Sequence, residues 1–187
     1  FLPDLTTNGA HLLADSPALD TLEALSLGEF NGSEPDDVAA EDLASSPRLG
    51  RLVHLWARHV PAGNGIARGL ARNSHARGLQ EAEFFGAGLG ANPFAEFASS
   101  PAAKGLRVLN LQTNYFGDDA VRALVESPLR SLSKLNLRYN SLTAESARLL
   151  ATWPGLRSVR ELLLGGNQFG ASGARALLAS EHLTGLT

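Results

Sequence analysis

The chain has 187 residues and a formal net charge of −3, and its scattered Arg and Lys lack the charge pattern of a nucleic-acid binder. It contains no Cys, which excludes a disulfide framework, a Cys-ligated zinc site and a cysteine nucleophile. No apolar run approaches the roughly 20 residues needed to span a membrane, and none resembles a secretory signal. The absence of both Cys and a secretory signal favours a cytoplasmic protein.

An internal repeat of about 27 residues runs through the chain. The three clearest units have apolar residues at positions 1, 4, 6 and 11, with Asn at 9, Ala or Val at 16 and Leu at 19, and the earlier units follow this pattern less strictly. Residues 1–21 form a partial repeat, with Leu5, Ala10 and Leu13 at positions 11, 16 and 19. Full repeats start at residues 22, 52, 79, 106, 132 and 159, and a further strand begins at 186. The repeat at 22 is longer than the others, which predicts an insertion around residues 32–34.

Two kinds of apolar spacing follow each other within a unit. Positions 1–6 read LxxLxL, and this alternation predicts a strand whose positions 4 and 6 share the core face. Positions 13–21, as in DDAVRALVE at residues 118–126, space apolar residues three and four apart and predict an amphipathic helix. Asp118 and Thr143 stand where they would cap two helices, and Asp36 or Asp37 would cap another. Prolines at position 23 predict where helices stop: Pro17, Pro47, Pro101, Pro128 and Pro154.

The pattern LxxLxLxxNxL occurs at residues 106–116, 132–142 and 159–169, with Phe at the last position twice. It resembles the motif of leucine-rich-repeat proteins, and the period of about 27 residues with a full helix is similar to the ribonuclease-inhibitor and Ran GTPase-activating subfamily. The resemblance implies an α/β solenoid in the form of a horseshoe arc, with about six to seven repeats. Its parallel sheet would lie on the concave side and its helices on the convex side.

The resemblance also implies a role for the Asn at position 9 of the repeat. In such proteins this side chain bonds backbone groups of the turn, so Asn114, Asn140 and Asn167 are expected to form a structural ladder. The earlier repeats depart from the motif at this position, with Asn31 as a local substitute in the first of them. The residues found there instead are Phe30, Val60 and Ala87.

Catalytic and metal-binding patterns are absent from the sequence. His54 and His59 with Glu81 and Glu83 are zinc-ligand types, but His54 and Glu81 both fall at position 3 of adjacent repeats, which favours a solvated cross-strand pair. The acidic run at residues 34–42 lacks the spacing of an EF-hand. The glycine pairs are not followed by the GKS or GKT of a P-loop, and spacing shows no Ser-His-Asp arrangement. We therefore expect no catalytic residue, metal site, cofactor or enzymatic activity.

The candidate binding surface is the concave face, formed by positions 3, 5 and 7, which point off the sheet away from the core. Two adjacent strands there combine Trp and Arg, residue types enriched in binding hot spots, with both signs of charge. We expect a cation–π contact between Arg58 and Phe85. Lys134, Arg138 and Tyr139 extend the surface and give it a basic end that suits an acidic partner segment. The candidate protein-binding residues are His54, Trp56, Arg58, Glu81, Glu83, Phe85, Lys134, Arg138 and Tyr139.

These observations predict a protein–protein interaction module that binds a partner through the concave sheet and adjoining loops, whereas a small-molecule ligand would want an enclosed pocket. Two alternatives stay open: a regulatory or sensing segment of a larger multidomain enzyme or effector, and, from the resemblance alone, a GTPase-activating-like regulator. It is also open whether Trp56 and Phe85 face a partner or pack within the chain. Because the ends carry no polar capping repeat, we expect residues 1–187 to be one leucine-rich-repeat domain of a longer chain.

Overall fold

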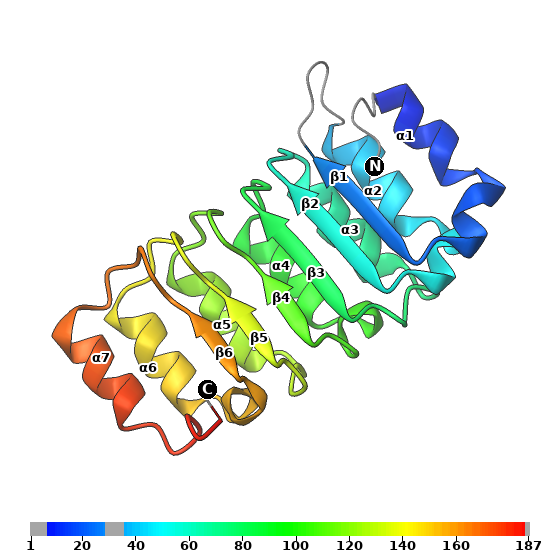
Figure 1. Cartoon of the computed structure of the whole chain (residues 1–187). Helices are drawn as coiled ribbons and strands as arrows, with labels where there is room; N and C mark the ends of the chain where they lie inside the picture. The colour runs from blue at the N-terminus through cyan, green and yellow to red at the C-terminus, as the bar shows by residue number, and fades with distance from the viewer. Residues whose placement is uncertain (1–6, 29–35, 186–187) are drawn as a thin grey trace.

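Strands and helices alternate along the chain in the computed structural model, which describes residues 7–28 and 36–185 (Figure 1). One parallel sheet runs in the order β1 (Ala24–Gly28), β2 (His54–Arg58), β3 (Glu81–Phe85), β4 (Val108–Asn110), β5 (Lys134–Asn136) and β6 (Glu161–Leu163). The α-helices are α1 (Thr7–Ala14), α2 (Asp37–Ser45), α3 (Gly63–Arg72), α4 (Ala91–Ala98), α5 (Asp118–Glu126), α6 (Ala144–Thr152) and α7 (Gly170–Leu178). Short 3-10 helices precede four of the strands: η1 (Pro17–Thr21), η2 (Pro47–Arg51), η3 (Pro101–Ala103) and η4 (Pro154–Ser158).

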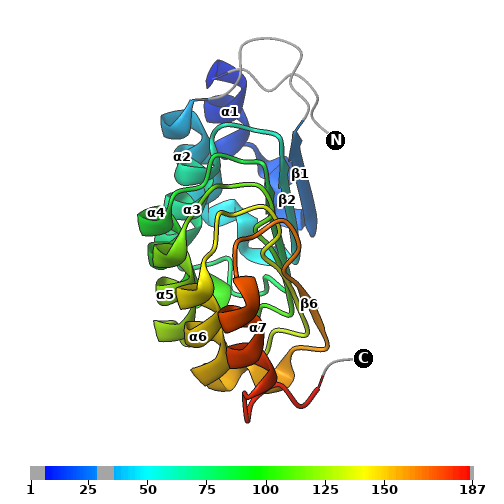
Figure 2. The ribbon, with the colours of Figure 1, turned by 90° about the vertical axis from the view of Figure 1, so that its left-hand side faces the viewer.

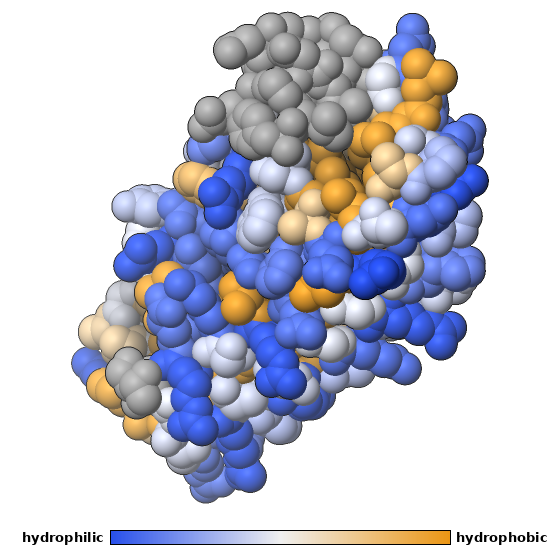
Figure 3. All heavy atoms as spheres, turned by 45° about the vertical axis from the view of Figure 1, so that its right-hand side comes forward, coloured by the Kyte–Doolittle hydropathy of each residue, from blue (hydrophilic) through white to orange (hydrophobic). Residues whose placement is uncertain are grey.

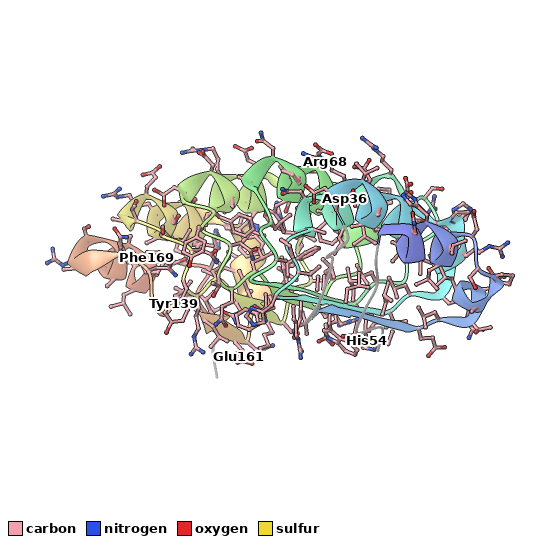
Figure 4. All side chains as sticks on the ribbon, turned by 90° about the horizontal axis from the view of Figure 1, so that it is seen from above. Asp36, His54, Arg68, Tyr139, Glu161 and Phe169 are labelled. Atoms are coloured by element: carbon pink, nitrogen blue, oxygen red, sulfur yellow. The ribbon has the colours of Figure 1, made fainter. Side chains whose placement is uncertain are left out.

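The sheet and the helices form two layers. Figure 2 shows the helices stacked on one side of the molecule and the strands on the other. Seen from above in Figure 4, the helices follow a shallow convex arc over the sheet, which is open at both ends. Each strand begins two residues after one of the predicted repeat starts, and α5 and α6 cover positions 13–21 of their repeats. The fold class predicted from the repeat is therefore confirmed.

The core lies between the two layers and follows the register of the repeat. Equal repeat positions pair across the sheet, so that Leu109 stands beside Leu135 and Leu135 beside Leu162. Leu109 and Leu135 are fully buried, whereas Leu162 and Leu164 are only partly buried. β6 is the last strand that the structure describes, and β5 is its one described neighbour in the sheet.

The helix starts confirm two predicted caps and correct a third. The Asp36 carboxylate accepts the backbone N–H of Ala39 at 2.8 Å, and the Thr143 hydroxyl accepts that of Glu145 at 3.1 Å. Asp118, predicted as a cap, is instead the first residue of α5. The reason is the backbone at Gly117, whose φ of 65° leads directly into the helix, so that the Asp118 side chain is free to reach the next repeat.

Asp118 joins α5 to the start of α6. Its carboxylate accepts the backbone N–H of Thr143 at 2.9 Å and the Thr143 hydroxyl at 2.6 Å, and it also bonds the backbone and hydroxyl of Ser146. The same repeat position is used twice more. Asp37 accepts the N–H of Gly65 at 2.8 Å, and Asn64 accepts that of Gly90 at 2.8 Å. These side chains fix the spacing of successive helices by satisfying donors at their N-termini.

Some predictions fall outside the described residues. They are Leu5 of the partial repeat, Phe30 and Asn31, the insertion around residues 32–34, and the strand at residue 186. At the N-terminal end of the described sheet, an apolar hollow of 220 Å³ lies beside β1, lined by residues that include Leu19, Leu22 and Leu25. Figure 3 shows hydrophobic residues gathered at this end. Among the described residues, no helix combines the length and the apolar character needed to cross a membrane.

Candidate functional site

β2 and β3 place the first group of predicted binding residues side by side on the sheet face. Because side chains alternate across a strand, residues at positions 3, 5 and 7 project from this face while Leu55 and Phe84 between them are buried in the core. The parallel register sets three pairs opposite one another: His54 and Glu81, Trp56 and Glu83, Arg58 and Phe85. We refer to these six residues as the β2–β3 patch.

Glu81 organises one half of the β2–β3 patch. One of its carboxylate oxygens accepts the indole N–H of Trp56 at 2.8 Å, and the other lies 3.1 Å from Nδ1 of His54. The rings of His54 and Trp56 stack with centroids 5.7 Å apart and an interplanar angle of 16°. Trp56 is half-buried and held in one orientation by these contacts. It therefore presents a fixed aromatic surface on the sheet face.

Arg58 and Glu83 form the other half. The guanidinium donates from Nε to Glu83 at 2.7 Å, and its terminal nitrogen lies 2.7 Å from the same oxygen. The prediction of a cation–π contact between Arg58 and Phe85 is wrong. Phe85 makes an edge contact with His59 instead, with centroids 4.4 Å apart. The physical reason is that a charge-assisted hydrogen bond is stronger than a cation–π contact at an exposed position.

The second predicted group lies further along the same face and is separated from the first by β4. Lys134 is paired with Glu161 of the next strand at 3.0 Å, so its charge is largely matched. Arg138 is exposed, and Tyr139 is 54% exposed. Figure 4 shows Tyr139 and Glu161 on the sheet side of the molecule, away from the helices. The basic end expected from the sequence is thus reduced to Arg138.

A row of aromatic side chains borders the sheet face where the strands lead into the loops. We call it the aromatic rim; it consists of His59, Phe85, Tyr115 and Tyr139. These four residues line a hollow of 350 Å³, and an adjoining hollow of 480 Å³ shares His59 and Tyr115 with it. Tyr115 is 76% exposed, the greater exposure of the two tyrosines.

Sequence reasoning missed Tyr115, and the backbone explains why it stands out. His59, Tyr115 and Tyr139 have φ values of 52°, 56° and 54°, a left-handed conformation that few residues other than Gly adopt. Gly86 and Gly88 take the equivalent conformations in another repeat. The glycines at these repeat positions were the signal that the sequence offered. They mark turns with positive φ, and a residue other than glycine at the same position is directed outward by the turn.

Asn114, Asn140 and Asn167 bond backbone groups of their own and the preceding repeats. Asn114 accepts the N–H groups of Ala87 and Leu89 at 3.2 and 3.0 Å. The Asn140 oxygen accepts the N–H of Asn114 at 2.8 Å, and the Asn167 oxygen accepts that of Asn140 at 2.9 Å. Asn114 and Asn140 are buried, while Asn167 is partly exposed. These side chains fix the loops that carry the aromatic rim.

The acidic run of the sequence is distributed among separate contacts in the structure. Within residues 36–42, Asp36 and Asp37 bond helix N-termini, Glu41 pairs with Arg72, and Asp42 lies 2.8 Å from Nδ1 of His11. Glu34 lies outside the described residues. In the part of the chain that the structure describes, no three His, Asp or Glu side chains gather as metal ligands would.

Comparison with known proteins assigns the repeat. A family model described as "Leucine Rich repeat" matches residues 129–151 and 155–178, which include β5 and all but the last residue of α6, and then β6 and α7. Over 103 residues the chain is 38% identical to a ribonuclease inhibitor of Sus scrofa, an alignment that covers 53% of this chain and 22% of that protein. The chain thus spans about a fifth of the length of this relative.

Proposed function

The chain is a leucine-rich-repeat protein of the ribonuclease-inhibitor type, and from that premise we propose that it binds another protein through the sheet face, with the β2–β3 patch as the anchor. The observation that carries this proposal is the stacked pair of His54 and Trp56, fixed by Glu81 on an open face. A rigid aromatic anchor costs little conformational entropy on binding.

The shape of the surface favours a protein over a small molecule. The β2–β3 patch is an open strip along two strands, whereas small ligands are usually enclosed by their sites. The aromatic rim adds Tyr115 and Tyr139 beside two shallow hollows, into which partner side chains would fit. Tyr and Trp are enriched among the residues that dominate interface energetics.

The charges of the patch are already matched within the chain. Glu83 pairs with Arg58, and Glu81 bonds both His54 and Trp56. A partner therefore need not supply a large complementary charge to this surface. Binding would depend on shape and aromatic contact, with hydrogen bonds at the margin.

The proposal is tested with the variant Trp56→Ala. A protein captured by the wild-type chain is titrated with the wild-type chain and with the variant, and the two affinities are compared. A purified ribonuclease is titrated in the same way as a first named partner, because the Sus scrofa relative is called a ribonuclease inhibitor. Loss of a hot-spot tryptophan is expected to weaken binding by about 2 kcal/mol or more, roughly thirty-fold in Kd, with the melting temperature nearly unchanged.

The matched control is Leu178→Ala, which removes an apolar side chain that is 82% exposed on α7, in the helical layer. It should leave binding unchanged. If Trp56→Ala lowers the melting temperature while its folded fraction binds at full strength, Trp56 serves packing and the sheet-face proposal is wrong. If the ribonuclease alone does not bind, ribonuclease is rejected as the partner. The sheet-face proposal is then decided by the affinities measured with the captured protein.

A further inference from the structure

The segments that connect each helix to the next strand form a second charged surface, at the tails of the strand arrows in Figure 1. Between residues 73 and 160, the segments 73–80, 99–107, 127–133 and 153–160 contain no Asp or Glu, whereas the last described segment, 179–185, contains Glu181. The four segments without acidic residues carry one or two cations each, which we call the basic edge: Arg77, Lys104, Arg107, Arg130, Arg157 and Arg160. This concentration contrasts with the net charge of −3 for the whole chain.

The backbone places these segments side by side. The N–H of Arg107 donates to the carbonyl of Gln80 at 2.8 Å, that of Ser133 to Arg107 at 2.7 Å, and that of Arg160 to Ser133 at 2.7 Å. Four successive repeats therefore present their cations along one line, across the direction of the strands. An extended ligand lying along this line would meet one segment of each repeat in turn.

The first two segments of the same edge provide an internal comparison. There Arg48 lies 2.9 Å from Asp20 and Arg51 lies 3.1 Å from Glu23, so both cations are matched by acidic residues of the preceding helix-to-strand segment. The four corresponding segments between residues 73 and 160 contain basic residues and no acidic ones. The edge is thus neutralised over its first two segments and basic over the next four, up to the segment that carries Glu181.

The side chains of the basic edge are exposed and have few partners of opposite charge. Lys104 and Arg107 make no ion pair among the described residues, while Arg77 and Arg130 donate only to neutral backbone carbonyls. Arg157 donates to Nδ1 of His182, which requires that nitrogen to be unprotonated. Glu81 and Glu161, which open β3 and β6, already bond other side chains.

We propose that the basic edge docks an acidic, extended polypeptide segment of a partner, at a surface separate from the β2–β3 patch. A nucleic acid fits less well, because the bases of a single strand bind proteins by stacking on exposed aromatic rings. Apart from His75, the aromatic residue of these four segments is Trp153, and it is only 1% exposed. A long polyanion would also meet the net negative charge of the rest of the chain. A short acidic segment responds to the charge within about 10 Å of it.

The test uses the whole chain and a short glutamate-rich peptide, with the glutamine peptide of the same length as the uncharged comparison. The variant Lys104→Gln/Arg107→Gln/Arg157→Gln removes three cations from the basic edge. At low ionic strength it should bind the glutamate peptide about ten-fold more weakly than wild type, and added salt should remove most of the difference. The glutamine peptide should bind neither protein.

The matched control, Arg68→Gln/Arg122→Gln/Arg175→Gln, removes the same charge from the helical layer, where Figure 4 labels Arg68. It should bind the glutamate peptide within about two-fold of wild type. Equal weakening by the two variants would overturn the proposal, because it would reflect net charge alone. Tighter binding of a thymidine oligonucleotide of equal charge would also overturn it, in favour of a nucleic-acid surface. Melting curves of both variants verify that each is folded, and Trp56→Ala should leave peptide binding unchanged.

Discussion

Asp118 illustrates how a single side chain joins two repeats. Burial raises the pKa of its carboxyl, but the hydrogen bonds from Ser146 and Thr143 together outweigh burial and hold the pKa below its ordinary value. All of these bonds favour the charged carboxylate, which accepts them. Because Thr143 itself caps α6, loss of Asp118 would loosen the start of the next helix as well.

We predict that Asp118→Ala lowers the free energy of unfolding at pH 7 by about 1 kcal/mol, the usual cost of a lost helix cap. The folded-state pKa is below the unfolded value, so the native state binds fewer protons. The stabilisation is therefore present above the unfolded pKa of about 4 and is lost as pH falls through the folded pKa. Urea unfolding at several pH values measures the difference between wild type and variant, which should shrink below pH ~4.

Asp119→Ala is the control, since Asp119 lies in the same helical turn and its exposed carboxyl makes no hydrogen bond or ion pair with any residue that the structure describes. This variant measures how much the interaction of a carboxylate with the helix dipole contributes to the free energy of unfolding. An Asp118→Ala deficit that persists unchanged in acid would show that the carboxylate charge is not the source of the stabilisation.

At the scale of elements, α2 and α3 pack closely because α3 carries Gly65 and Gly69 one turn apart. A Cβ atom at Gly65 would lie 2.0 Å from the backbone oxygen of Asp37, and one at Gly69 would lie 2.4 Å from that of Glu41. Both obstacles are backbone atoms, which cannot move aside as the end of a side chain would. The small residues therefore set the distance between these two helices.

We predict that Gly65→Ala lowers the free energy of unfolding by about 1–3 kcal/mol through overpacking. The prediction opposes intrinsic helix propensity, by which alanine is favoured over glycine by about 1 kcal/mol. Thermal melting measures the effect. Gly50→Ala is the control, because its nearest contact would be an ordinary one of 3.8 Å with the His75 side chain. A Gly65→Ala variant that melts above wild type would mean that α2 and α3 separate at little cost.

At the scale of the whole molecule, the solenoid buries its leucines unequally along its length. Leu135 lies on β5 between two neighbouring strands and is fully buried, whereas its register partner Leu162 lies on β6 and is partly exposed. In a stacked array each repeat is stabilised mainly by its neighbours. A leucine at this repeat position therefore contributes more to the free energy of unfolding on β5 than on β6.

We predict that Leu135→Ala costs about 2–5 kcal/mol of unfolding free energy, through lost burial and the cavity left behind. Leu162→Ala should cost clearly less, because solvent already reaches that side chain. Urea denaturation of the two variants under the same conditions makes the comparison. Equal losses would indicate that β6 is as well packed as β5.

The repeat spacing alone determined the strands, the helices and the face on which each residue lies. Leu109, Leu135 and the predicted helices at α5 and α6 follow from apolar spacing, because strand and helix periods select one buried face locally. The same register predicted the His54–Glu81 pair. These features depend on neighbours at fixed repeat distances, which the sequence displays directly.

Only the tertiary structure decided which partner each polar side chain takes and which loop residues project outward. Arg58 bonds Glu83 and leaves Phe85 to His59, and Lys134 pairs with Glu161, because each choice depends on side-chain rotamers and on diagonal distances across a twisted sheet. The exposure of Tyr115 depends on a left-handed backbone turn fixed by the Asn side chains beneath it. Apolar spacing carries no information about such choices, since alternative partners on the same face have the same period.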